Sequence, residues 1–135
     1  MTKSKQVLGL DVGTARIGVA LADTAVRIAI PHGYIEVDGS EFKQIAELAI
    51  ANGVETIVLG YPRNQAGEPT AQTAYVEDFA EKLSDIDATV VFQDESLTSV
   101  IAEKRLIQQG APYTKGDIDS EAAVIILQDY LEQRV

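Results

Sequence analysis

Acidic residues stand at the predicted edges of three buried segments. Asp11 follows a short apolar run, Asp94 and Glu95 together follow a second, and Asp119 precedes a longer one. Carboxylate oxygens are the ligands that Mg²⁺ and Mn²⁺ prefer in proteins. Acids that converge from these segments could hold two such ions roughly 4 Å apart and support in-line hydrolysis of a phosphodiester.

Each of these acids also has a structural explanation. An aspartate after a strand often forms a turn, but Gly13 and Thr14 already supply turn residues beside Asp11. Glutamate is a poor turn residue, so the pair Asp94 and Glu95 is more telling, although spacing alone leaves open which of the two points inward. The alternative for this pair is a solvated acid near the positive end of the following helix.

Asp119 stands near the start of a predicted helix. Thr114 and Asp117 fit a capping box, which places Asp119 beyond the first turn. The apolar residues that follow predict a buried helix, and an acid on its inner edge is costly unless it pairs or binds a metal ion. We expect Asp117 and Glu121 to be the capping or exposed acids of this segment.

The hydrophobic pattern predicts the elements that carry these acids. The predicted strands cover residues 7–11, 17–22, 26–37, 56–59 and 89–92, and the last of these ends at residues 93–95. The predicted helices cover 42–52, 76–83 and 97–107, and the last helix begins after the cap at Thr114 and carries the apolar residues of 123–131. This order predicts an α/β fold with a mixed five-stranded sheet, a three-strand antiparallel meander plus two parallel strands, flanked by helices. Asp11 and Glu95 both fall at carboxyl ends of strands, where ligands bind in such sheets.

Length and composition favour one globular domain over residues 1–135, with 46% hydrophobic and 24% charged residues. The absence of cysteine excludes a disulfide, a thiolate zinc site and a cysteine nucleophile. His32, in a predicted Pro-His-Gly turn, gives no support to a histidine zinc site. Neither a signal peptide nor a membrane span is recognisable, so we expect a cytoplasmic protein without membrane contact.

The formal net charge of -10 is unusual for a protein that binds nucleic acid, because phosphate contacts normally leave a basic surface. Either the protein avoids polyanions, or it combines a small basic patch with metal ions that cancel the negative charge of its site. Composition alone favours the first explanation.

Four sequence blocks carry a family resemblance. They are residues 8–20, residues 58–64 with Gly67, residues 94–99, and residues 115–123. Together and in this order they resemble the YqgF family over nearly the whole chain. Members of this family are bacterial proteins described as Holliday-junction-resolvase-like and as pre-16S rRNA nucleases.

The resemblance implies an RNase H-like fold and phosphodiester hydrolysis that depends on Mg²⁺ or Mn²⁺. It places the catalytic, metal-binding acids at Asp11, Glu95 and Asp119, and it selects Glu95 over Asp94. The implied substrate is the 5′ end of pre-16S rRNA, with branched DNA as the alternative. The small ribosomal subunit is then an expected partner, and the chain is expected to act as a monomer or a homodimer.

The chain departs from the family pattern at basic and loop positions. Ala15 stands where the first block commonly has lysine, and Ser96 stands where arginine is usual. Tyr61 and Arg63 replace leucines of the loop block. These departures bear on substrate affinity and preference more than on the chemistry of the acids.

The remaining basic and polar candidates for substrate contact are few. They are Arg16, Arg63, Asn64 and Lys115, with Lys104 and Arg105 as further members of a basic patch. A solvated surface charge is the alternative explanation for each cation. No groove of interleaved aromatic and basic residues is visible in the sequence, which argues against extensive base stacking.

Two other functions compete with the nuclease. Residues 10–14 also resemble the first phosphate loop of the actin, Hsp70 and sugar-kinase fold, but the chain has room for only one such domain and lacks the second phosphate loop. A catalytically idle module that binds nucleic acid or the ribosome also fits the acidic composition. Such a module would tolerate alanine at Asp11, whereas a nuclease would not.

Overall fold

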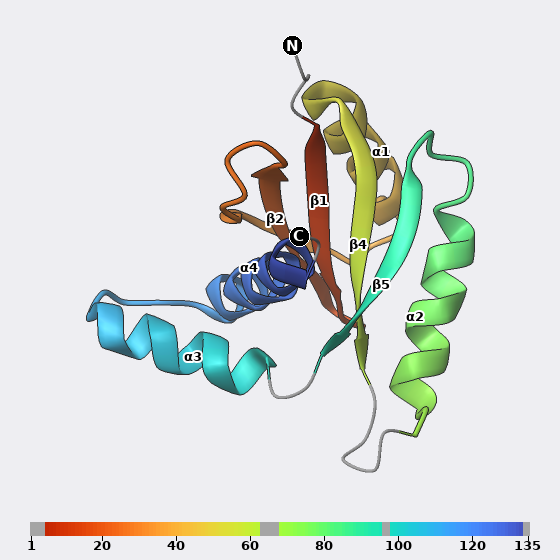
Figure 1. The fold of residues 1–135 in the computed structure, drawn as a ribbon. Coiled ribbons are helices and arrows are strands. Elements are labelled where there is room, and N and C mark those ends of the chain that lie inside the picture. Colours follow the sequence, from red (N-terminus) through yellow and green to blue (C-terminus); the bar gives the residue numbers. More distant parts are fainter. Residues whose placement is uncertain (1–4, 63–67, 96–97, 134–135) are drawn as a thin grey trace.

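The computed structural model describes residues 5–62, 68–95 and 98–133, without the side chains of residues 98 and 99. One sheet has the strand order β3-β2-β1-β4-β5 (Figure 1). Its strands are β1 (Gln6–Val12), β2 (Arg16–Asp23), β3 (Ile30–Glu36), β4 (Val54–Pro62) and β5 (Thr89–Glu95). The first three pair antiparallel, and β4 runs parallel to both β1 and β5. The predicted mixed five-stranded sheet is therefore confirmed.

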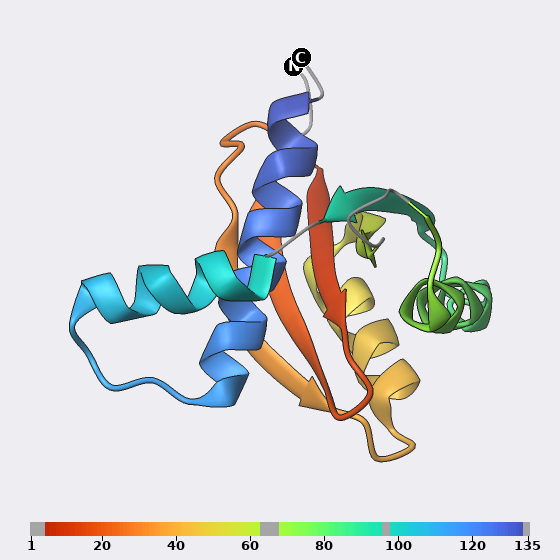
Figure 2. The same cartoon turned by 90° about the horizontal axis from the view of Figure 1, so that it is seen from below.

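The described helices cover both faces of this sheet. They are α1 (Glu41–Asn52), α2 (Ala71–Lys82), α3 (Thr98–Gln109) and α4 (Lys115–Gln133). Helix α4 crosses one face and contacts every strand, while α1 and α2 lie on the other face (Figures 1 and 2). Helix α3 packs on α4 and extends away from the sheet (Figure 2). In the described ranges, no helix is both long enough and apolar enough to cross a membrane.

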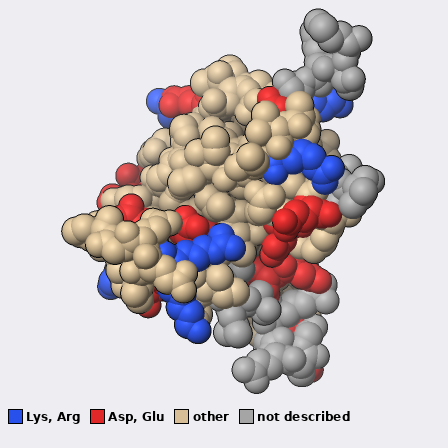
Figure 3. Space-filling view, turned by 60° about the vertical axis from the view of Figure 1, so that its left-hand side comes forward, with Lys and Arg blue, Asp and Glu red and all other residues tan. Residues whose placement is uncertain are grey.

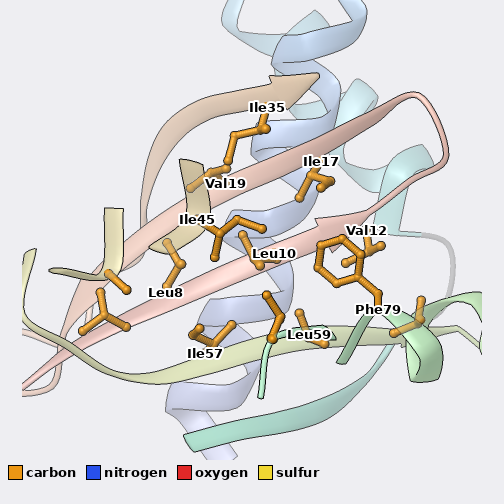
Figure 4. Packing of buried hydrophobic residues seen from close by; sticks show 14 residues of the cluster. Leu8, Leu10, Val12, Ile17, Val19, Ile35, Ile45, Ile57, Leu59 and Phe79 are labelled. Atoms are coloured by element: carbon orange, nitrogen blue, oxygen red, sulfur yellow. The ribbon is translucent and has the colours of Figure 1, made fainter. Parts of the chain in front are cut away.

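Strand alternation produces two cores, one on each face. Toward α1 and α2, buried side chains from four strands meet two helices (Figure 4); the largest include Leu8, Leu10, Ile17, Ile45, Ile57, Leu59 and Phe79. Toward α4, the buried set includes Val7, Ala20, Val58, Ala123, Ile126 and Leu127. Because β1 and β4 are buried on both faces, the carboxyl ends of these strands are held in fixed positions.

Local capping explains where α4 begins and where α1 ends. The predicted capping box of α4 is present, since the Thr114 amide donates to Asp117 at 2.8 Å and the Asp117 amide donates to Thr114 Oγ1 at 3.2 Å. Gly53 ends α1 in the left-handed conformation, with φ of 63°. The prediction that Glu121 is a capping or exposed acid was wrong. Its side chain is only 14% exposed and pairs with Arg105 of α3 at 3.6 Å, so it links α3 to α4.

The predicted strand over residues 26–37 was wrong at its beginning, because β3 starts at Ile30. Asp23 Oδ1 accepts the Ala25 amide at 2.7 Å, and Arg27 has a positive φ of 61°. These contacts turn the chain before it can pair as a strand. His32, predicted in a turn, instead lies exposed within β3.

Candidate functional site

Asp11, Glu95 and Asp119 come together at the carboxyl edge of the sheet. Asp11 is the penultimate residue of β1, Glu95 is the last of β5, and Asp119 lies in the second turn of α4. The pKa of Asp11 is raised from 3.8 to about 7, first by burial and then by the negative charges of Glu95 and Asp119. The fold thus gathers the three predicted acids into one cluster, which we call the carboxylate site.

Gly18 allows α4 to approach Asp11. Gly18 is the β2 partner of Asp11 in the antiparallel register. A Cβ atom at Gly18 would lie 1.8 Å from the backbone oxygen of Asp119, so the helix rests directly on this glycine. The missing side chain at position 18 therefore brings Asp119 next to Asp11.

Gly60 makes the corresponding space for Glu95. A Cβ atom at Gly60 would lie 2.9 Å from Glu95 Oε2 and 2.6 Å from Ile126 Cδ1. The glutamate carboxylate and Ile126 of α4 therefore both lie close over the backbone of β4 at Gly60. Two strand glycines therefore leave the space that two of the three acids occupy.

Substituting Gly18 tests this packing. We expect Gly18→Ala to lower the free energy of unfolding by about 3 kcal/mol or more, because the added methyl group cannot coexist with the helix backbone. Gly33→Ala is the matched control. Its φ of 83° is unfavourable for alanine, but a Cβ atom there meets no heavy atom within 4 Å, so we expect a loss of about 1 kcal/mol. Urea unfolding measures both, and equal losses would contradict the proposed contact.

Arg16 orients the third acid. Its Nε donates to Asp119 Oδ2 at 2.6 Å, and the two side chains are 33% and 21% exposed. A charge-assisted hydrogen bond of this length fixes the carboxylate and leaves both groups in contact with solvent. Arg16 remains a predicted substrate contact, and a substrate phosphate would have to share the guanidinium with Asp119.

The carboxylate site fits a hard divalent cation by its chemistry. Its donors are all carboxylate oxygens, the ligands that Mg²⁺ and Mn²⁺ prefer. Burial, and then the charges of Glu95 and Asp119, raise the pKa of Asp11, so a bound cation would favour its ionised form. Within the described part of the chain, however, no three His, Cys, Asp or Glu side chains are arranged closely enough to form a ready-made metal centre.

The other predicted contacts are dispersed. Lys115 is exposed at the start of α4, and Lys104 is exposed on α3. Arg105 is engaged with Glu121, while Arg63 and Asn64 lie outside the described residues. On the face shown in Figure 3, the cations form small groups separated by acids rather than one basic stripe.

Gly18 and Gly60 were missed as site residues, although a glycine inside a strand is a signal of close approach.

A family model described as "RuvX: Holliday junction resolvase" matches residues 5–133. A protein of Chloroflexus aggregans named "Putative pre-16S rRNA nuclease" is 43% identical, covering 95% of this chain and 94% of its own length. A protein of the same name from Sulfurihydrogenibium is 39% identical, covering 95% of this chain and 90% of its own. These names confirm the predicted nuclease class.

Solved structures show the same fold at much lower identity. Thermus thermophilus RuvC, solved with a Holliday junction substrate, aligns with a TM-score of 0.57 and 18% identity over 96% of this chain and 95% of its own. The fowlpox virus resolvase, solved with Holliday junction DNA, aligns with a TM-score of 0.56 and 11% identity over 95% of this chain and 97% of its own. The RNase H-like fold predicted from the sequence is therefore confirmed.

Proposed function

Since the chain belongs to the RuvX family, a family of nucleases, we propose that it hydrolyses phosphodiester bonds with two Mg²⁺ or Mn²⁺ ions held by Asp11, Glu95 and Asp119. The observation that carries this proposal is the convergence of the three acids at the carboxyl edge of the sheet, where Gly18 and Gly60 leave room for Asp119 and Glu95. Burial, and then the charges of Glu95 and Asp119, also raise the pKa of Asp11, and groups with shifted pKa values cluster at functional sites.

The side chains of the site then have distinct tasks. Asp11 supplies a partly buried carboxylate, and Glu95 reaches over Gly60 from the neighbouring strand. Arg16 holds Asp119 and places a positive charge where a substrate phosphate would arrive. When bound, the ions would stabilise the charge of the phosphodiester and activate the attacking water.

The proposed substrate is the 5′ end of pre-16S rRNA. Relatives named for this substrate are 35–43% identical and match nearly the full length of this chain. Holliday junction DNA is the second candidate, because the matching family model is described as a resolvase. The RuvC and fowlpox structures support the fold of this proposal but, at 11–18% identity, not its substrate.

Cleavage assays with purified protein and Mg²⁺ or Mn²⁺ test the proposal. The substrates are a 5′-extended 16S rRNA precursor and a four-way DNA junction. We expect Glu95→Gln and Asp119→Asn to reduce cleavage by about 100-fold or more, because each removes a charged metal ligand. Asp78→Asn removes one negative charge from an exposed position on α2 and should leave the rate unchanged.

Each result has a definite meaning. Faster cleavage of the junction than of the RNA would replace the proposed substrate with branched DNA. Cleavage that survives in both acid variants would show that the carboxylate site is not catalytic. Absence of both cleavage and metal binding would favour the idle binding module instead.

A further inference from the structure

A buried hydroxyl of α4 joins two strands of the sheet next to the carboxylate site. Ser120 directly follows Asp119 in the helix and is only 4% exposed. Its Oγ donates a hydrogen bond to the carbonyl oxygen of Val19 in β2 at 3.1 Å and accepts one from the amide of Gly33 in β3 at 3.1 Å. The hydroxyl thus spends its single donor and one of its acceptor sites on the backbone of the sheet.

This bridge lies where the pairing of β2 with β3 is irregular. Val19 stands alone opposite two residues of β3, His32 and Gly33, so the strands form a β-bulge at this point. A bulge interrupts the ladder of backbone hydrogen bonds. The Ser120 hydroxyl lies between an amide of one strand and a carbonyl of the other, in the place that a direct backbone bond would take.

The first turn of α4 rests on the sheet beside the same bulge. Tyr34 is the β3 partner of Gly18, so its side chain lies on the face that α4 covers. A Cβ atom at Gly116 would lie 2.3 Å from the Tyr34 ring, so the ring rests on the backbone of the helix. Packing contacts at Gly18 and Gly116 set how closely α4 approaches the sheet. Hydrogen bonds add a required direction, which the Ser120 bridge supplies.

We propose that Ser120 is a positioning residue for metal binding, because its bridge to β2 and β3 sets the rotation of α4 that directs the Asp119 carboxylate toward Asp11. This inference rests on the proposed function. Neighbouring residues of an α-helix project about 100° apart around its axis, so a fixed Ser120 also fixes the direction of Asp119. Arg16 then holds the end of the same side chain, through the bond of 2.6 Å to Asp119 Oδ2.

Small rotations of α4 are large on the scale of metal coordination. Side chains reach roughly 5–6 Å from the axis of a helix, so a rotation of about 10° moves a carboxylate by about 1 Å. Metal ligands must lie within about 0.2 Å of their preferred distance. Loss of the Ser120 bridge is therefore expected to weaken metal binding even in a protein that remains folded.

Titration with Mn²⁺, followed by the electron paramagnetic resonance signal of the free ion, tests this role. We expect Ser120→Ala to weaken Mn²⁺ binding by about 10-fold or more, as is typical when a group that supports a metal ligand is lost. Cleavage by this variant should need about 10-fold more Mn²⁺ to reach half its maximal rate.

Gln128→Ala is the matched control on the same helix. Gln128 also accepts a hydrogen bond from one backbone amide, that of Ala29 at 2.9 Å, and donates to one backbone carbonyl, that of Arg27 at 3.2 Å. It lies about two and a half turns beyond Asp119. We therefore expect Gln128→Ala to lower the urea midpoint of unfolding, as Ser120→Ala does, but to leave the affinity for Mn²⁺ unchanged.

The outcomes separate the positioning role from the nuclease proposal. Equal Mn²⁺ affinity of Ser120→Ala and the unsubstituted protein, or an equal loss of affinity in both variants, would overturn the positioning role. Weaker Mn²⁺ binding in Ser120→Ala alone would support it, even if the unsubstituted protein cleaved neither substrate and the nuclease proposal failed. Absence of Mn²⁺ binding by the unsubstituted protein would overturn both.

Discussion

Asp11→Asn is expected to abolish metal-dependent cleavage and, in the same protein, to raise the stability of the metal-free state at pH 8. The activity loss follows because the substitution removes the charge that holds a cation. We expect the rate of cleavage to fall by about 100-fold or more. The stability gain follows because burial and two neighbouring acids disfavour the ionised Asp11 carboxylate in the folded protein.

The pH dependence of this gain has a definite sign. The pKa of Asp11 is about 7 in the folded protein and near 3.8 when unfolded, so the folded state binds the additional proton between these values. Stability of the unsubstituted protein therefore falls as the pH rises from 4 through 7. Because Asp11 is only partly buried, we expect Asp11→Asn to be more stable at pH 8 by about 1–2 kcal/mol, less than the full shift would give. At pH 4 the difference should nearly vanish.

Urea unfolding in EDTA at pH 4 and pH 8 measures this difference. Asp78→Asn is again the matched control, since its carboxyl is exposed on α2 and pairs only with Lys82 among the described residues. We expect no gain from that variant at either pH. If Asp11→Asn were less stable than the unsubstituted protein at pH 8, Asp11 would be a structural acid with a compensating partner, and the carboxylate site would lose its main support.

The sheet could be predicted because its signals are local. Short apolar runs, the Asn52-Gly53 stop of α1 and the Thr114 capping box of α4 each act within a few residues. The beginning of β3 was predicted wrongly because the turn at Asp23 depends on side-chain hydrogen bonds that hydropathy does not report. The apolar pattern of α3 likewise does not reveal which side of the helix is buried. Val100, Ile101 and Ile107 give it a helical apolar pattern, yet all three are more than 40% exposed because α3 packs on α4 through another side.

The acids of the site could be predicted from their types and from the strand ends that they follow, with the family resemblance selecting Glu95. What could not be predicted is why they converge. The contact of Gly18 with Asp119 and the contact of Gly60 with Glu95 depend on strand register and on the placement of α4. The pairing of Arg16 with Asp119 joins residues that are distant in sequence, so spacing carries no information about it.

Mg²⁺ or Mn²⁺ is expected to raise the melting temperature of the unsubstituted protein by about 10 °C at pH 8. An ion that binds only the folded state at 100 times its dissociation constant stabilises it by about 2.7 kcal/mol. For a domain of this length, each kcal/mol raises the melting temperature by roughly 3–5 °C. The rise should be smaller at pH 6, because the pKa of Asp11 near 7 means that a proton must leave before the carboxylate can bind the ion.

Thermal unfolding with and without the ions, at constant ionic strength, compares the unsubstituted protein with Asp11→Asn and Asp78→Asn. We expect Asp78→Asn to show the full rise and Asp11→Asn to lose most of it. Without metal Asp11→Asn is then the more stable protein, and with saturating metal the order reverses. An acid that serves only the fold cannot produce this reversal, because its contribution has the same sign in both conditions. An equal rise in Asp11→Asn would place the ions elsewhere and contradict the carboxylate site.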